Sequence, residues 1–459
     1  MRNGIINLLA VNVRSECQLK FAIHSKVSTG YLPTNHSGME QQAFASIITI
    51  GDELLIGQVV DTNSAWMAQE LNKAGIWVKR RVAVGDNWDE IWHALDEESK
   101  HASIILITGG LGPTADDITK PLLCKYFGGK LVVDEKVLAH VKYLFEKVFR
   151  RTGPMLERNL KQAEVPDVCT VLHNARGTAP GMWFEKDGKV YVSMPGVPHE
   201  MKGLMTDLVL PKLAGYFKMA AIVSRTLLTF GIGESFLAER IKTFEEALPP
   251  HIKLAYLPNY GMVRLRLTGT GTNGESIKQE VESLFETLVA QLPDVLVTDK
   301  DEPMEKVVGR LLEERKKTMA TAESCTGGYI AHRITQHAGS SAYFKGSIVS
   351  YANEVKETLL QVPAVYFTTV GAVSEEVVKD MVKGVLHEIK ADYAIAVSGI
   401  MGPGGATAEK PVGMVWVAVG NAHKTVTQLF NFRFDRARNI EMTAMNAFNL
   451  LRKFILEND

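Results

Sequence analysis

The feature that most constrains the fold of this chain is a repeated alternation between short apolar strands and longer amphipathic helices. Residues 46–50 predict a buried strand, 61–75 a helix, 77–84 a second strand and 103–108 a third. Strands separated by helices of this length are joined by right-handed crossovers and lie parallel in one sheet. The sequence therefore predicts an α/β protein.

The length of the chain predicts several domains, because 459 residues are too many for one compact core. The strand and helix alternation supports a first α/β domain over 39–215 and a last one over 300–459. Between them, 216–299 predict a small α+β middle domain, in which 263–268 alternate with the period of a half-buried strand. This middle domain carries no catalytic cluster and is interpreted as a spacer or a dimerisation module.

Charge and cysteine usage exclude several classes of protein. The chain has 51 basic and 52 acidic residues, a balance that predicts neither a nucleic-acid nor a membrane-surface partner. Its longest apolar runs, such as 104–107, are far too short to span a membrane. The four cysteines are scattered without metal-ligand spacing, which favours reduced thiols and a cytoplasmic location.

The first 38 residues do not fit this pattern. They mix short apolar runs with polar residues, and they lack an apolar core followed by a small-residue cleavage site. A second methionine, Met39, stands just before the first strong strand pattern. We interpret 1–38 as a disordered extension or a misassigned start, with a targeting peptide as the alternative.

Reactive side chains gather in a glycine turn at 321–328, Thr-Ala-Glu-Ser-Cys-Thr-Gly-Gly. A turn of this kind at a helix start can present a nucleophile such as Ser324 and direct backbone N–H groups at an anion. Tyr351 and Lys356 follow downstream, and a lysine of lowered pKa can accept the serine proton, directly or through a tyrosine. The alternatives are that Ser324 caps a helix, that Cys325 is the nucleophile, or that Lys356 is a solvated helix residue.

Two further segments of the last domain are rich in glycine or charge. The loop 398–405 reads Ser-Gly-Ile-Met-Gly-Pro-Gly-Gly and continues to 409–413, Glu-Lys-Pro-Val-Gly. Asp435 and Arg436 follow later in the chain. The loop is either a floor under a substrate or purely conformational, and Glu323 either orients a base or pairs with a lysine.

Together these segments resemble the CinA C-terminal domain family, which contains the nicotinamide mononucleotide amidases, over 300–459. The resemblance implies hydrolysis of nicotinamide mononucleotide to nicotinate mononucleotide and ammonia without a cofactor. It implies that Ser324 is the nucleophile, that Tyr351 and Lys356 activate it, and that Arg436 helps to hold the substrate.

The expected substrate contacts of this domain are backbone and cationic groups. The substrate's 5′-phosphate needs N–H groups or a cation. The substrate-binding residues expected on this basis are Thr326, Gly327, Gly328, Gly402, Gly404, Gly405 and Arg436. The sequence departs from the family pattern at Phe434, where glycine is frequent, and at Met401, where a small residue is usual.

A second constellation lies in the first domain. The turn Gly109, Gly110, Leu111, Gly112, Pro113, Thr114 follows a predicted strand and can cradle phosphate groups. Gly109, Gly110, Gly112 and Thr114 are the expected phosphate-binding residues. Asp116 and Asp117, with Asp52 and Glu53 of an earlier turn, are expected to bind a divalent metal. The alternative is that these acidic pairs cap helices.

These N-terminal segments, over 43–215, resemble the N-terminal half of CinA proteins, whose three-layer α/β fold is similar to the molybdopterin-binding domains of the MoaB and MogA type. Leu111 replaces the threonine of the usual Gly-Gly-Thr-Gly turn, which argues against molybdopterin chemistry. The resemblance implies instead a metal-dependent ADP-ribose pyrophosphatase. It also suggests a homodimer that acts on small nucleotides and not on nucleic acid or membranes. The alternatives are a nucleotide-sensing protein linked to competence and a molybdopterin-binding domain.

Overall fold

The computed structural model describes residues 43–458 apart from 115, 151–154, 218–219 and 260. The extension expected at 1–38 lies outside the described residues. Within the described ranges, no helix is long and apolar enough to cross a membrane. Three sheets organise three domains.

The first domain is built on a six-stranded sheet of order β2-β1-β3-β8-β7-β6. The strands are β1 (Phe44–Ile50), β2 (Trp77–Val84), β3 (Ile104–Thr108), β6 (Thr170–Leu172), β7 (Gly181–Lys186) and β8 (Lys189–Met194). The first three and β8 run parallel, as predicted, but β7 is antiparallel to β8 and to β6. The prediction of a purely parallel sheet is wrong at this edge. Asp187 and Gly188, both at positive φ, form a two-residue turn that folds β7 back against β8.

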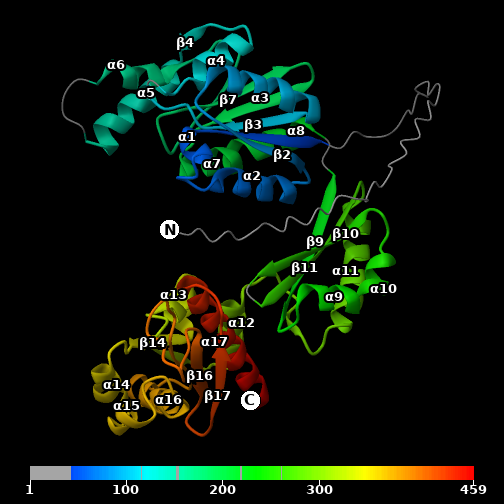
Figure 1. The fold of residues 1–459 in the computed structure, drawn as a ribbon. Helices are drawn as coiled ribbons and strands as arrows, with labels where there is room; N and C mark the ends of the chain where they lie inside the picture. The colour runs from blue at the N-terminus through cyan, green and yellow to red at the C-terminus, as the bar shows by residue number, and fades with distance from the viewer. Residues whose placement is uncertain (1–42, 115, 151–154, 218–219, 260, 459) are drawn as a thin grey trace, which may run out of the picture. The chain divides into compact units, whose positions relative to one another are not determined.

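Helices cover both faces of this sheet and make three layers (Figure 1). One face packs against α2 (Thr62–Lys73), α7 (Pro198–Leu204) and α8 (Leu210–Tyr216), and the other against α3 (Trp88–His101) and α4 (Thr119–Tyr126). Neighbouring residues of β1 separate accordingly, since Ile47 belongs to the first core and Ile48 to the second. The three-layer α/β prediction is confirmed.

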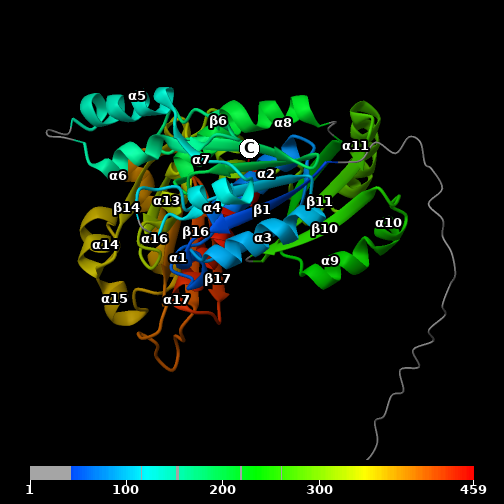
Figure 2. The same ribbon diagram turned by 90° about the horizontal axis from the view of Figure 1, so that it is seen from above.

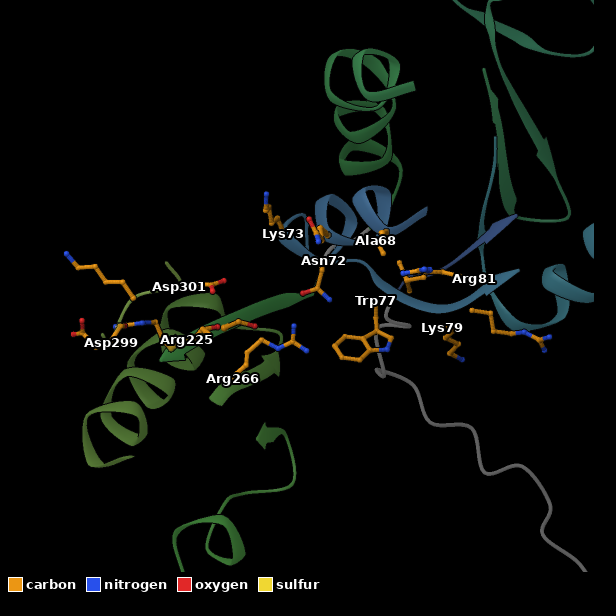
Figure 3. A pocket seen from close by; sticks show the side chains of 17 residues that line it. Ala68, Asn72, Lys73, Trp77, Lys79, Arg81, Arg225, Arg266, Asp299 and Asp301 are labelled. Atoms are coloured by element: carbon orange, nitrogen blue, oxygen red, sulfur yellow. The ribbon is translucent and has the colours of Figure 1, made fainter. Parts of the chain in front are cut away.

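The strand β2 is an edge of this sheet and carries a run of basic residues. The side chains of Trp77, Lys79 and Arg81 on this strand appear in Figure 3. Arg80 between them forms an ion pair with the buried carboxylate of Glu98, with 3.1 Å between Nε and Oε1. Charged side chains on an edge strand hinder pairing with another chain, so the edge position of β2 accounts for its basic run.

An insertion of short elements follows α4 in the first domain. It comprises β4 (Leu131–Val133), α5 (Glu135–Tyr143), a π-helical turn (Leu144–Val148), α6 (Glu157–Leu160), a 3-10 turn (Lys161–Ala163) and β5 (Glu164–Pro166). The amphipathic pattern of 132–151 predicts one long helix region, and the structure shows that the predicted start is wrong. The Asp134 carboxylate accepts from the N–H groups of Lys136 and Val137, so the helix begins only at 135 and the preceding residues pair with β5.

The middle domain is an antiparallel sheet of order β10-β11-β9-β12 with helices on one face. Its strands are β9 (Ala221–Phe230), β10 (Ile252–Asn259), β11 (Met262–Gly271) and β12 (Leu296–Thr298), and its helices are α9 (Glu234–Arg240), α10 (Lys242–Glu246) and α11 (Gly274–Ala290). Apolar residues from all three helices share a core with β10 and β11. Figure 2 shows these helices beside the two strands.

The last domain has a five-stranded sheet of order β14-β13-β15-β16-β17. The strands are β13 (Met319–Glu323), β14 (Phe344–Val349), β15 (Tyr393–Gly399), β16 (Met414–Gly420) and β17 (Thr425–Asn431). β13 is parallel to both β14 and β15, whereas β16 and β17 are antiparallel. The carboxyl ends of the three parallel strands therefore lie at one edge, where ligand sites form in open α/β sheets.

Two layers of helices cover this last sheet (Figure 1). One face carries α12 (Met304–Glu314), α13 (Tyr329–Thr335) and α17 (Arg436–Asn458); the other carries α14 (Asn353–Leu360), α15 (Val365–Thr369) and α16 (Glu375–Ile389). The α/β architecture predicted for 300–459 is confirmed. The two layers place the starts of α13, α14 and α17 at the same edge as the parallel strand ends, as the contacts of the site show.

Candidate functional site

Ser324 stands at the carboxyl end of the central strand β13, between two neighbouring strand ends. Its N–H donates to Val397 O of β15 at 3.1 Å, and the N–H of Ser350, just after β14, donates to Glu323 O at 2.8 Å. Ser324 is 9% exposed, at the margin of the buried core. The backbone therefore brings the segments of Ser324 and Tyr351 side by side.

The carboxylate of Glu323 organises the turn that follows the strand. Its two oxygens accept from five donors: the hydroxyls of Thr321 and Thr326 and the N–H groups of Gly328, Ile330 and Ala331. The side chain is fully buried. Glu323 therefore caps the start of α13 and neither orients a base nor pairs with a lysine, which were the two roles considered from the sequence.

This cap determines which hydrogen-bond donors of the glycine turn remain available to a substrate. The Gly328 N–H and the Thr326 hydroxyl both donate to Glu323, at 3.1 Å and 2.7 Å, and the Gly327 N–H donates to Ser324 O at 3.1 Å. The anion site at this helix start is thus filled from within the protein. These three residues shape the turn that carries Ser324, and the Thr326 hydroxyl and the N–H groups of Gly327 and Gly328 are already used within it.

Lys356 lies deep in the same region, on the second turn of α14. It is 1% exposed, and its Nζ donates to Ser350 O at 2.7 Å and Tyr351 O at 3.3 Å. Burial lowers the pKa of this lysine. A neutral amine has two N–H groups and one lone pair, so these two acceptors leave the lone pair available to take a proton.

Arg436 connects three separate segments at the start of α17. Its Nη1 donates to Gly402 O at 2.8 Å and its Nη2 to the Tyr351 hydroxyl at 3.2 Å. Tyr351 itself is 63% exposed. Among the described residues, no hydrogen bond joins the Ser324 hydroxyl to Tyr351 or Lys356. Tyr351 and Arg436 thus form a hydrogen-bonded pair, whereas Lys356 is buried and contacts Tyr351 through the backbone carbonyl.

Cys325 is poorly suited to the role of nucleophile. It is buried in the apolar core shared by α12 and α17, and burial raises the pKa of its thiol to about 12. The nucleophilic form of cysteine is the thiolate, which such a pKa makes rare at neutral pH. The Lys356 and Arg436 charges nevertheless act on this thiol, which places both cations near the Ser324 turn.

The glycine loop after β15 is shaped largely by backbone demands. Gly402 and Gly405 adopt positive φ values of 86° and 88°, whereas a Cβ on Gly404 would meet nothing within 4 Å. The Ser398 hydroxyl donates to Ala372 O at 2.7 Å, so it has a structural partner. Met401, expected to crowd a pocket, packs into the core instead.

Asn439 belongs to this site and escaped the sequence reasoning. It is fully buried in the first turns of α17, and its amide binds the backbone of Met401 and Phe434. Its only sequence signal is its position three residues after Arg436. An asparagine at such a position is ordinarily solvated, and only the packing of the glycine loop buries it.

The predicted phosphate turn of the first domain lies at the carboxyl end of β3. A Cβ on Gly109 would lie 2.2 Å from Ile50 O, and one on Gly110 would lie 2.1 Å from the Thr119 hydroxyl oxygen. Both positions therefore require glycine. The Asp117 carboxylate accepts from the N–H groups of Gly112 and Thr114 at 2.7 Å and 2.8 Å. Asp117, predicted as a metal ligand, is thus engaged in holding the turn.

The carboxylates near this turn include one that the sequence analysis did not single out. Asp86 and Asp52 each accept from the other's backbone N–H at 3.1 Å. Burial raises the pKa of Asp86, and the nearby charges of Asp52, Glu53 and Asp116 raise it further. The acidic set is therefore Asp52, Glu53, Asp86 and Asp116, with Asp86 in the place expected for Asp117.

The positions of these carboxylates bear on the metal site predicted from the sequence. Across the described ranges, no three carboxylate, imidazole or thiolate groups lie close enough together to hold an ion. The predicted ligand set does not fit a metal as it stands, and no reaction step is derived through one. A cavity of about 140 Å³ nearby is lined by residues at the ends of β1 and β3, such as Thr49 and Thr108, and at the start of α2, such as Asn63.

Three protein families match successive parts of the chain. The probable molybdopterin binding domain family matches residues 46–215, the damage-inducible protein CinA KH domain family matches 224–296, and the CinA C-terminal domain family matches 301–455. KH domains bind nucleic acid through a Gly-x-x-Gly loop. Here only Ile241 separates α9 from α10, so such a loop does not join these two helices.

Relatives of similar length match almost all of the chain. A CinA-like protein of Cytophaga hutchinsonii is 47% identical over 91% of this chain and 100% of its own length. One of Flavobacterium psychrophilum is 45% identical over 90% of this chain and 99% of its own. A putative competence-damage inducible protein of Caldicellulosiruptor bescii is 40% identical over 90% and 99%. With this coverage and these domains in this order, the chain belongs to the CinA family.

Proposed function

We propose that the last domain hydrolyses the carboxamide of nicotinamide mononucleotide to a carboxylate and ammonia. The observation that carries the proposal is the environment of Lys356, a buried amine with two backbone acceptors beside the Ser324 turn. Burial lowers the pKa of this lysine, so its amine loses its proton more readily than an exposed lysine and can act as a base.

The reaction follows from these groups in two halves. In the first, Ser324 Oγ attacks the amide carbon as its proton passes to the neutral Nζ of Lys356, and the C–N bond then breaks as that proton moves to the leaving nitrogen. In the second, water attacks the resulting ester and gives a proton to Lys356, which returns it to Ser324. Amide and water are consumed, and carboxylate and ammonium are formed.

The remaining groups serve binding and charge stabilisation. Arg436 carries a fixed positive charge beside the Tyr351 hydroxyl and is the group suited to the substrate's phosphate. The N–H of Thr326, in the turn after Ser324, has no hydrogen-bond partner among the described residues. It is the available donor for a developing oxyanion, a contribution of roughly 3–4 kcal/mol in known hydrolases.

The test is ammonia release from nicotinamide mononucleotide by the purified full chain. We expect release from the wild type and none above background from Ser324→Ala. Cys325→Ala is the matched control, since the neighbouring thiol lies in the core. If Ser324→Ala retained activity while Cys325→Ala lost it, the assigned nucleophile would be wrong.

A second candidate activity belongs to the first domain: hydrolysis of ADP-ribose. It is favoured by the glycine turn at 109–112, which follows β3, and by Asp86, a carboxyl group whose pKa is raised by burial and by the nearby charges of Asp52, Glu53 and Asp116. Titration with ADP-ribose, with and without a divalent cation, separates hydrolysis from binding without turnover. Binding without product would favour the sensing role, and binding of a molybdopterin instead would favour the cofactor role.

A further inference from the structure

Asn439 joins two segments that are far apart in the sequence. Its Nδ2 donates to Met401 O at 3.1 Å and to Phe434 O at 3.0 Å, while its Oδ1 accepts from the Phe434 N–H at 3.3 Å. The side chain is fully buried. A buried amide is costly unless it is hydrogen-bonded, so these contacts hold the glycine loop against the segment that leads into α17.

The same two segments determine where the Arg436 guanidinium lies. Arg436 begins α17 two residues after Phe434, and its Nη1 donates to Gly402 O, the carbonyl next to that of Met401. Asn439 thus fixes both the backbone from which Arg436 extends and the loop on which its guanidinium rests. An arginine constrained at both ends loses little freedom when it binds a ligand.

The anion-binding capacity of the site depends on this arginine. The N–H groups of Gly328, Ile330 and Ala331 at the start of α13 already donate to Glu323. Arg436 uses two of the five N–H groups of a guanidinium on Gly402 O and the Tyr351 hydroxyl. A planar guanidinium with donors to spare is the group that best matches phosphate geometry.

We propose that Asn439 is a positioning residue that holds Arg436 ready for the phosphate of a mononucleotide substrate. This inference rests on the proposed amidase site. It assigns to Asn439 an effect on binding that is specific for a phosphate-bearing ligand, and no direct contact with the reacting amide.

The variant Asn439→Asp tests the proposal with almost no change of size. It removes both N–H donations and sets a carboxylate against the Met401 and Phe434 carbonyls. In full-length protein we expect KM for nicotinamide mononucleotide to rise about tenfold while kcat changes less than threefold, since Ser324 and Lys356 lie on other elements.

Direct binding separates this proposal from the amidase assignment. Calorimetry in the Ser324→Ala background gives Kd without turnover, and we expect Asn439→Asp to weaken nicotinamide mononucleotide about tenfold and nicotinamide riboside less than twofold. The riboside lacks the phosphate. Equal weakening of both ligands would overturn the proposal, whereas ligand binding without ammonia release in the wild type would overturn only the amidase assignment.

A double-mutant cycle between Asn439 and Arg436 distinguishes a role that acts through the arginine from a merely structural role. If Asn439 acts through Arg436, then Asn439→Asp adds less than about twofold to the loss caused by Arg436→Ala. Full additivity would show that Asn439 acts independently of the arginine. The same cycle is measured with Asn439→Ser, which keeps one small donor. This second variant tests the proposal if Asn439→Asp fails to fold.

Discussion

At the scale of single residues, buried charge and its hydrogen-bond partners define the candidate site. Glu323 is a fully buried carboxylate whose oxygens accept from five donors of its own turn. Lys356 is a buried amine whose partners are two backbone carbonyls. The sequence showed both residues in a reactive context but left two roles open for Glu323, neither of which is the cap that the structure shows, because the contacts of this cap form only when the turn folds back.

Glu323→Gln is predicted to destabilise the last domain by about 2–4 kcal/mol and to lower ammonia release. The amide NH₂ of glutamine would face N–H donors that now meet a carboxylate oxygen. Thermal unfolding and activity of the same preparation measure both effects. Glu314→Gln, at an exposed ion pair with Arg310, is the control and is expected to cost less than about 1 kcal/mol.

The amidase activity is predicted to rise with pH through the pKa of Lys356. Burial lowers this pKa below its ordinary 10.5, and the base must be neutral, so the active fraction grows as pH increases through the lowered value. The kcat/KM profile should show this acidic limb, and Lys356→Arg should be inactive because arginine keeps its proton. A flat profile would contradict the role of Lys356 as the base.

Cys325→Ala is predicted to keep amidase activity within about threefold, with a stability loss of about 1 kcal/mol from the small cavity. Its thiol is buried, with a pKa raised to about 12 by that burial. Thiol-directed alkylation of the native enzyme should therefore leave Cys325 unmodified, as peptide mass analysis would show. Rapid inactivation through modification of Cys325 would contradict this interpretation.

At the scale of elements, period and capping identified most strands and helices from the sequence. The strand 77–84 was predicted with the bounds that the structure has, and the helix predicted over 61–75 corresponds to α2, which Asp61 caps. The errors lie at 131–133, where an apolar run pairs as a strand, and at β7, which runs antiparallel. Both depend on which partner strand is available, and a local pattern contains no information on that partner.

Gly384→Ala is predicted to destabilise the last domain by about 2 kcal/mol or more, although alanine favours helices elsewhere. A Cβ at this position of α16 would lie 2.2 Å from the Leu360 carbonyl oxygen. Calorimetric unfolding measures the loss. Gly404→Ala in the same domain is the control, since its Cβ would meet nothing within 4 Å, and an equal loss there would refute the packing argument.

At the scale of the whole molecule, each candidate site is built from residues of one domain. The Ser324 site uses β13, α14 and α17, and the acidic set uses segments between 52 and 116. We therefore predict that Ser324→Ala abolishes ammonia release and leaves ADP-ribose hydrolysis unchanged. Asp86→Asn should do the reverse. Loss of both activities in either variant would contradict independent sites.

The sequence by itself determined the α/β class, the three successive domains and the segments proposed to carry chemistry, because period, turn residues and motif spacing are local properties. Tertiary structure alone decided which groups remain available: it turned Glu323 and Asp117 inward, buried Cys325 and Lys356, and brought Asn439 to the glycine loop. The physical reason is that desolvation and hydrogen-bond satisfaction depend on neighbours distant in the chain.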